Sequence, residues 1–170
     1  MDLQNKSVDY YAENGAKIGT EEINIIHQRR LIHKSVHVLV INSQEEIYIR
    51  KHHYLKKHYV GRWSCSVGAH IYKGDEPTQK AKLELASSLG LHTAVELLGR
   101  KRLSDAYENE MIYIFQTASN SVNLISTQET YEGSFTSVEM IKKLIENEET
   151  TPHLALAYEA YQEWKNSFKL

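Results

Sequence analysis

Alternation of apolar and polar residues in the first third of the chain predicts paired β-strands. Residues 35–41 alternate and are rich in β-branched side chains, which is the pattern of a half-buried strand. Asn42-Ser43 is typical of a tight turn, so residues 46–50 are predicted to be the hairpin partner. Two short strands are expected next, at residues 63–67 and 70–72.

The pattern then changes to a helical period. Asp75 is suited to the N-cap of a helix, and Pro77 fits its first turn. Apolar residues recur with helical spacing up to Gly90, a residue type that commonly ends helices; they are Ala81, Leu85, Ala86 and Leu89. The spacing predicts one helix from Asp75-Glu76 to Leu89, packed on a sheet through these apolar side chains.

Strands and helices continue to the end of the chain. Strands are expected at residues 94–103, 110–117 and 122–127, and Ser137 is a good N-cap for a helix over 138–146. A last helix begins near Thr151, and its apolar stripe consists of Leu154, Tyr158, Tyr161, Trp164 and Phe168. We interpret the stripe as core packing; a partner-binding face is the alternative. The order of elements predicts an α/β fold with a mixed sheet and helices on both faces.

Length and composition narrow the range of functions. A chain of 170 residues with 41% apolar residues supports one domain, here residues 23–170, preceded by a polar extension over 1–22. The net charge of −2 argues against general nucleic-acid or membrane-surface binding. We find no membrane-spanning run and no signal-peptide pattern. The single cysteine, Cys65, cannot form an internal disulfide, which fits a cytoplasmic protein.

The segment from Gly68 to Leu91 resembles a Nudix box that has lost most of its carboxylates. The intact motif reads Gly, five residues, Glu, seven residues, Arg-Glu, an aliphatic, any residue, Glu-Glu, any residue, Gly, aliphatic. The aligned residues, in the order of the conserved positions, are Ala69, Asp75, Leu83-Glu84, Ser87-Ser88 and Gly90-Leu91. The frame of the motif is therefore present while its metal chemistry is reduced.

Helical spacing places Glu84, Ser87 and Ser88 on one face, where the motif holds Mg²⁺ against a diphosphate. A carboxylate near 4 Å from a cation contributes roughly 4 kcal/mol per unit charge at an effective dielectric constant of about 20. Two serines there predict weak Mg²⁺ binding. The resemblance implies that Glu84 is the catalytic base or metal ligand; the alternative is a solvent-facing helix carboxylate. Leu83, at the arginine position, is expected to pack in the core.

A wider resemblance, over residues 20–165, is to the isopentenyl-diphosphate-isomerase-like branch of the Nudix superfamily. Its motifs are Ile25-Ile26-His27, Leu31-Ile32-His33-Lys34, Val36-His37-Val38, Lys51-His52, Lys56, Tyr59, Gly61, Trp63, Ser66-Val67, His70, Glu108-Asn109-Glu110 and Thr151-Pro152-His153-Leu154. Val60 departs from the pattern, which usually has proline there. The resemblance implies a metal site whose ligands are His27, His33, His70, Glu108 and Glu110.

Imidazole and carboxylate ligands suit a first-row metal such as Mn, Zn or Fe. Alternatively, the histidines are surface or hydrogen-bonded residues, and the region around Asp105 is a solvated loop. The catalytic cysteine of the isomerases falls on Gly68, and Cys65 lies three residues earlier, where a strand would turn it to the opposite face. The pattern therefore argues against isomerase activity.

A basic, aromatic loop offers a second kind of site. The resemblance implies that basic residues here contact substrate phosphates, and the candidates are Arg50, Lys51, Lys56 and Arg62. The alternative is a solvated cationic loop.

The sequence thus predicts a Nudix-type protein acting on a nucleotide- or isoprenoid-linked diphosphate, with Mg or Mn as cofactor. Activity is expected to be weak or absent, and hydrolysis is favoured over isomerisation. The competing hypothesis is a non-catalytic module that binds a nucleotide, a diphosphate or a protein partner. The predicted assembly is a homodimer.

Overall fold

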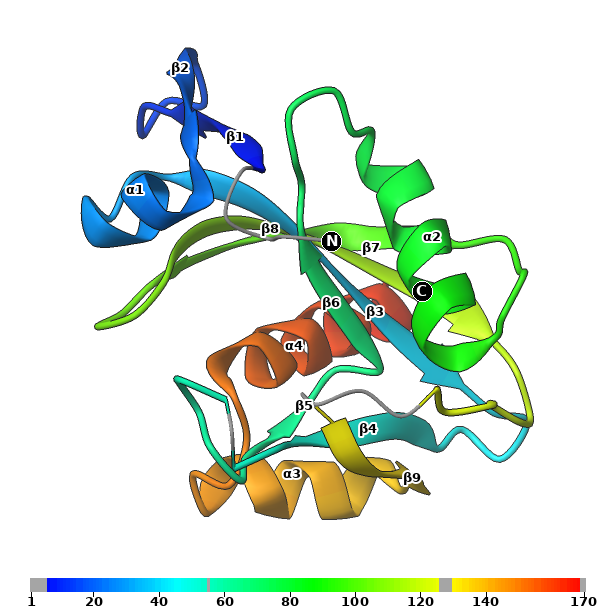
Figure 1. Ribbon diagram of the computed structural model, residues 1–170. Helices are drawn as coiled ribbons and strands as arrows, with labels where there is room; N and C mark the ends of the chain where they lie inside the picture. Colours follow the sequence, from blue (N-terminus) through cyan, green and yellow to red (C-terminus); the bar gives the residue numbers. More distant parts are fainter. Residues whose placement is uncertain (1–5, 55, 126–129, 169–170) are drawn as a thin grey trace.

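The computed structural model describes residues 6–54, 56–125 and 130–168 (Figure 1). In chain order the elements are β1 (Ser7–Tyr11), β2 (Lys17–Glu22), α1 (Ile23–Gln28), β3 (His33–Ile41), β4 (Ile47–His52), β5 (Trp63–Ser64), β6 (Val67–His70), α2 (Pro77–Leu89), β7 (Glu96–Ser104), β8 (Asn109–Ala118), β9 (Thr130–Thr136), α3 (Val138–Glu146) and α4 (Pro152–Ser167). No helix in these ranges is both long and apolar enough to cross a membrane.

A mixed sheet organises the molecule. Among the described residues it has seven strands, with β5-β4-β3-β8-β7 as the main path, β6 paired with β3, and β9 paired with β4. β3 runs parallel to β8, and the other pairings are antiparallel. The central strand β3 therefore touches β4, β6 and β8, which makes it the element best placed to gather side chains from several parts of the chain.

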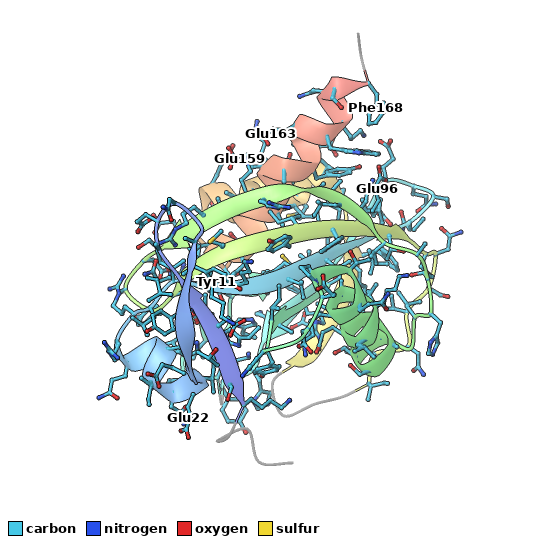
Figure 2. The ribbon with its side chains drawn as sticks, turned by 90° about the horizontal axis from the view of Figure 1, so that it is seen from above. Tyr11, Glu22, Glu96, Glu159, Glu163 and Phe168 are labelled. Atoms are coloured by element: carbon cyan, nitrogen blue, oxygen red, sulfur yellow. The ribbon has the colours of Figure 1, made fainter. Side chains whose placement is uncertain are left out.

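Helices cover the two faces of this sheet, as the sequence predicted. On one face α2 packs Ala81, Leu85 and Leu89 against the valines of β3. On the other face, α3 and α4 enclose a second apolar cluster, in which Leu154 of α4 packs with Leu39 of β3. In Figure 2 the strands lie between α2 and α4. The predicted mixed α/β sandwich is confirmed.

The alternation along β3 has a functional consequence. Val36, Val38 and Val40 join the α2-side core, so the intervening residues point toward α4. The first of these intervening positions are polar, namely His33, Ser35 and His37, and all three are buried. Buried polar side chains at the start of a central strand need partners, and they form the floor of the candidate site described below.

The N-terminal segment is more ordered than its polarity suggested. β1 and β2 form a separate antiparallel hairpin, and Val8 packs with Ile23 and Ile26 of α1. Tyr11 also forms a bridge to Ile32, directly before β3. The hairpin thus fixes where α1 lies relative to the main sheet, although the domain boundary at residue 22 stays a prediction.

The predicted helix over 76–89 is confirmed, and Gly90 ends it in the left-handed conformation with φ of 63°. Its N-cap differs from the expectation: Glu76 occupies that position, and the Asp75 carboxylate accepts a hydrogen bond from Tyr72 N at 3.1 Å. The prediction that Leu83 is a core residue is wrong, because it is 63% exposed. Leu85 and Leu89 face the sheet, and a residue two positions from Leu85 lies on the opposite side of the helix.

Two strand predictions also need correction. Residues 122–125 are not a strand; Asn123 N and Ile125 N instead donate to Leu89 O and Ser88 O, which satisfies carbonyls at the end of α2. Residues 126 and 127 of that prediction lie outside the described residues. The strand predicted at 63–67 is confined to β5 at Trp63–Ser64. The strand predicted at 70–72 lies earlier, as β6 at Val67–His70, and residues 71–72 are not a strand.

Strand β9 was missed, because its polar composition and Gly133 hide the strand pattern. A side chain at Gly133 would overlap Tyr48, whose ring fills the space above that glycine. At the C-terminus, Ser137 and Thr151 cap α3 and α4 as predicted. Leu154 and Tyr161 are buried as core residues, but Phe168 lies at the outer end of α4 (Figure 2) and is 70% exposed.

Candidate metal centre

Strand pairing brings together residues that are far apart in the sequence. His33 opens β3 and lies directly opposite Glu110 of β8. His70, at the end of β6, is opposite Ser35 on the other edge of β3. These two registers place His33, His70 and Glu110 around the start of one strand.

Two local features complete the group. His27 lies in the last turn of α1, which the N-terminal hairpin supports. Glu108 lies in the turn before β8, where the Asp105 carboxylate accepts hydrogen bonds from Tyr107 N and Glu108 N, both at 2.8 Å. Tyr59 Oη donates to the other oxygen of Asp105 at 2.5 Å. The five residues expected as metal ligands therefore meet at one place.

The distances show that their donor atoms converge. His27 Nε2 lies 3.2 Å from His70 Nε2, and 3.8 Å from Glu108 Oε2. Glu110 Oε1 lies 3.4 Å from His33 Nε2 and 3.6 Å from His70 Nε2. Ligand atoms about 2.0–2.2 Å from one tetrahedral ion are roughly 3.3 Å apart. The spacing therefore matches what a bound first-row metal requires.

The polar atoms left without partners also fit a metal ion. His33 Nε2 and Glu108 Oε2 are buried and have no hydrogen-bond partner among the described residues. His33 Nδ1 lies 3.0 Å from the carbonyl oxygen of Leu31, which can only accept, so we place the ring proton on Nδ1. This leaves the lone pair of Nε2 directed at the centre, the arrangement seen for metal-bound histidines.

Burial and nearby charges shift the pKa values of the two carboxyl groups, Glu108 and Glu110, in opposite directions. Burial, together with the nearby charge of Glu110, raises the pKa of Glu108 to about 7. Burial also opposes ionisation of Glu110, but the hydrogen bond from His153 and the close approach of the His33 ring outweigh it and hold that pKa well below its usual range. One carboxyl group is thus ionised and the other is near its midpoint at neutral pH, as expected for two acids sharing one site.

The pKa values of the three histidines are also shifted in different directions. Burial lowers the pKa of His70 to about 3 and also lowers that of His27, where the charge of His33 adds to the effect. Burial disfavours the charged form of His33 as well, but the adjacent Glu110 carboxylate raises its pKa overall. His27 and His70 are therefore neutral at pH 7, which is the form that binds metals.

Glu110 has a second set of partners that the sequence did not reveal. Its Oε2 accepts from His153 Nε2 at 2.9 Å and from Ser35 Oγ at 3.1 Å. His153 in turn stacks on His37, with 4.5 Å between ring centroids and 19° between ring planes. The signal for His37 was available in the spacing of His33, Ser35 and His37 on one face of β3. His153 had no such signal, since only the fold brings α4 to this point.

The resemblance places the catalytic cysteine of the isomerases at Gly68, and the His37 ring occupies the space that a side chain would need there. Gly68 pairs with His37 across the two strands, and a Cβ built on Gly68 would lie 2.6 Å from His37 Nδ1. The chain's own cysteine, Cys65, is buried in the apolar cluster under α4, and burial raises the pKa of its thiol to about 12. Neither position therefore provides a thiol placed to transfer a proton to or from a substrate.

The helix that carries the box residues shows a different environment. Glu84 Oε1 lies 3.0 Å from Lys80 Nζ, one helical turn earlier, and Lys80 also lies 3.8 Å from Asp75. Ser87 is exposed, and its hydroxyl donates back to the Glu84 carbonyl at 3.4 Å. Two groups of metal-ligating side chains occur among the described residues, and Glu84 belongs to neither.

The four basic candidates lie on β4 and in the segment that follows it. Lys51 Nζ is 3.9 Å from Glu132 Oε2 and lies over the Trp63 ring, 5.3 Å from its centroid. Arg62 is exposed, and its Nη1 donates to Thr150 O at 3.4 Å. Arg50 and Lys56 are half-buried. Lys51 is therefore ion-paired with Glu132, whereas Arg62 is held by a backbone carbonyl.

No family model matches the chain. Among curated proteins, 164 residues align with isopentenyl-diphosphate Delta-isomerase of Pectobacterium atrosepticum at 23% identity, covering 92% of each chain. Among solved structures, a Deinococcus radiodurans protein superimposes with a TM-score of 0.73 at 14% identity, covering 92% of this chain and 98% of that one.

Two further structures carry family names. The MutT protein of Methanosarcina mazei gives a TM-score of 0.67 at 15% identity, over 82% of this chain and 96% of that one. The NUDIX domain of Shewanella oneidensis NrtR, in complex with ADP ribose, gives 0.59 at 12% identity, over 76% and 86%. The chain therefore has the Nudix fold.

Proposed function

We propose that this Nudix-fold protein holds a divalent first-row metal ion in the His–Glu centre, defined as His27, His33, His70, Glu108 and Glu110. Its ligand would be a small-molecule diphosphate. The observation that carries the proposal is the convergence of five ligand side chains, two of which bury a donor atom that has no hydrogen-bond partner in the described structure.

The ligand chemistry narrows the choice of metal. Three imidazoles and two carboxylates suit Mn²⁺, Zn²⁺ or Fe²⁺, whereas Mg²⁺ prefers an all-oxygen set. Of the two metals that the sequence suggested, Mn²⁺ belongs in this centre, and Mg²⁺ would bind with a substrate at the box helix. A metal ion here would act as a Lewis acid on a phosphate oxygen.

Two comparisons support a diphosphate as the ligand. The similar isomerase is named for a diphosphate substrate, and the similar NUDIX domain was solved with ADP ribose, a nucleotide diphosphate. Lys51, Lys56, Arg50 and Arg62 would supply charge-assisted hydrogen bonds to its phosphates. The size and organic part of the ligand are left to the experiment.

Hydrolysis is the favoured reaction, at a low rate. Glu84 is the remaining box carboxylate, and its contact with Lys80 holds its side chain in place on α2. It would take the proton from the attacking water, the role of a general base. Isomerisation is disfavoured, because the position of the required thiol is Gly68 and the space beside it holds the His37 ring.

A specific observation favours a second candidate function. Ser87 and Ser88 replace the carboxylates that would hold catalytic Mg²⁺, while the His–Glu centre is intact. A protein that keeps a metal and a phosphate-binding loop but lacks the hydrolytic ions can act as a binding module. In that case the metal would be structural or would anchor the ligand.

One screen separates these candidates. Metal-stripped protein is supplied with Mn²⁺ and Mg²⁺, then tested for phosphate release and for thermal shift with nucleoside diphosphates, nucleotide sugars and isoprenoid diphosphates. Turnover that is lost in Glu84→Gln supports hydrolysis. Turnover that survives Glu84→Gln but is lost in Glu110→Gln moves the chemistry to the His–Glu centre.

Thermal shift without turnover supports the binding module, provided that Lys51→Ala or Lys56→Ala removes it. His92→Ala, an exposed histidine in the loop after α2, is the control. Failure of every compound to shift or react in the presence of Mn²⁺ contradicts the proposal that the ligand is a diphosphate.

A further inference from the structure

A second group of ligating side chains lies against the His–Glu centre. His37, His153 and Glu110 each offer one ligand atom, these atoms lie within 4.8 Å of one another, and all three residues are buried. Two histidines and one carboxylate form the ligand set of many catalytic zinc and non-haem iron sites. The group therefore has the right chemistry for a metal ion of its own.

Glu110 belongs to both groups through different oxygens. Its Oε1 faces His33 and His70 of the His–Glu centre, at 3.4 and 3.6 Å. Its Oε2 faces His153 at 2.9 Å, on the other side of the carboxylate. Because its two oxygens face two separate sets of histidines, the Glu110 carboxylate is placed to bridge two metal ions.

The state of His37 is the independent observation that points to a ligand. Its Nδ1 is fully buried and finds no hydrogen-bond partner among the described residues. Burying an imidazole nitrogen without a partner is unfavourable. This unpartnered nitrogen is therefore available to a metal ion.

The surrounding structure keeps this ring in place. His37 stacks on His153 on one side and lies over the backbone of Gly68 on the other, where even one added carbon would collide with it. Ser35 donates to Glu110 Oε2 and so holds the carboxylate that completes the group. Such fixed orientation is what second partners of metal ligands provide.

We propose that His37, His153 and Glu110 form a second divalent-metal site, and that Glu110 bridges it to the ion in the His–Glu centre. The inference rests on the proposed function in sharing Glu110, but its own two histidines belong to this site alone. Three protein ligands leave coordination positions open, and oxygens of a diphosphate are the ligand class that two adjacent metal ions bind.

Manganese provides the probe. Metal-stripped protein is equilibrated with Mn²⁺, the bound ions are counted by mass spectrometry of the metal, and the electron paramagnetic resonance spectrum is recorded. We expect two Mn²⁺ per chain with the exchange-coupled spectrum of a carboxylate-bridged pair. This readout needs no substrate and no substitution, so it tests the protein in its unaltered form.

Conservative variants then assign each ion. His37→Asn and His153→Gln keep a polar, uncharged side chain, and each should reduce the count to one and give the spectrum of an isolated Mn²⁺. His27→Gln should likewise leave one ion, now in the second site. Circular dichroism and thermal melting establish that each variant is folded, and His92→Ala should retain two coupled ions.

The outcomes separate the two proposals. One ion that is lost in His27→Gln but not in His153→Gln overturns the second site and leaves the His–Glu centre standing. One ion that is lost only in His153→Gln overturns the His–Glu centre as proposed, as well as the pair. Two ions without exchange coupling overturn the bridge, and no bound ion overturns both proposals.

Discussion

The His–Glu centre and the box helix α2 lie on opposite sides of the same short strand, and they have kept different parts of their chemistry. On β6, His70 points into the centre, while Val67 and Ala69 pack toward α2. The centre has buried donor atoms without partners, whereas the box carboxylate Glu84 is already paired with Lys80. A metal ion would satisfy the first region, but in the second it would compete with a lysine.

If the proposed function is right, this difference means that two metal sites carried by one fold can be separated by local substitution. The ligands of the centre come from α1, β3, β6, the turn before β8, and β8 itself, so each is fixed by the fold of a different element. The box positions lie on consecutive turns of one helix, and the residues of α2 that pack in the core are Ala81, Leu85 and Leu89 rather than Ser87 and Ser88. Loss of the box therefore does not imply loss of the centre.

The strongest test of the comparison removes a ligand from the centre. His33→Ala should weaken Mn²⁺ binding by about a hundredfold or more, since even partners outside the ligand shell contribute 10–100-fold. Calorimetric titration of the metal-stripped protein with Mn²⁺ measures this affinity. The control is Ser87→Ala on α2, which should bind Mn²⁺ as the unmodified protein does. Equal binding by His33→Ala and the unmodified protein would show that the centre holds no metal.

Rebuilding the box tests the other region. The unmodified protein should show no saturation by Mg²⁺ in the micromolar range, and the pair Ser87→Glu with Ser88→Glu should strengthen binding by more than about tenfold, because two charges are added beside the ion. Calorimetry with Mg²⁺ alone checks both statements. Tight Mg²⁺ binding by the unmodified protein would reveal ligands that compensate for the serines.

Glu84→Gln addresses catalysis at the same helix. If the protein turns over a diphosphate, this change should lower the rate by at least about tenfold, since a positioned base typically contributes about 10²–10⁴-fold. Phosphate release at saturating substrate measures it. The melting temperature should change little, because Glu84 is half-buried at the helix surface and its one ion pair contributes about 0.3–0.5 kcal/mol. An unchanged rate would remove Glu84 from the mechanism.

The pH dependence of metal affinity gives the smallest effect. Burial and Glu110 raise the pKa of Glu108 to about 7, so below pH 7 the carboxyl group holds a proton that a metal ion must displace. Affinity for Mn²⁺ should therefore rise by about threefold per pH unit between pH 6 and pH 8 for this one proton. Glu108→Gln should bind more weakly and lose this part of the slope. A steeper slope in the variant would contradict the assignment.

Much of the fold could be read from local patterns, because each pattern reports a nearby physical requirement. The alternation in 35–41 reflects a strand between two cores, and the spacing of Leu85 and Leu89 with Gly90 reflects a capped amphipathic helix. Leu83 was misassigned because the family position of an arginine was given more weight than helical geometry. Strand β9 was missed because its stability comes from Tyr48 and the register of β4 rather than from its own residues.

The candidate site was predictable only as far as the resemblance could align it. That His27, His33, His70, Glu108 and Glu110 converge is now a structural observation, while their role as ligands stays a proposal. The partnership of His37 and His153 could not be predicted, because it joins β3 to a helix over one hundred residues later through tertiary packing. Long-range contacts between side chains leave no periodic signal in one sequence.

The close approach of His37 to Gly68 limits the mutational paths that are open to this chain. Gly68→Cys, which would place a thiol where the similar isomerases use one, would force its Cβ into an imidazole that is buried and stacked, so that change alone should destabilise the protein. His37→Gly must come first, and it removes a ligand of the proposed second metal site. The two positions are therefore epistatic: a thiol at 68 and an imidazole at 37 exclude each other, and the order of substitutions decides whether any intermediate is folded.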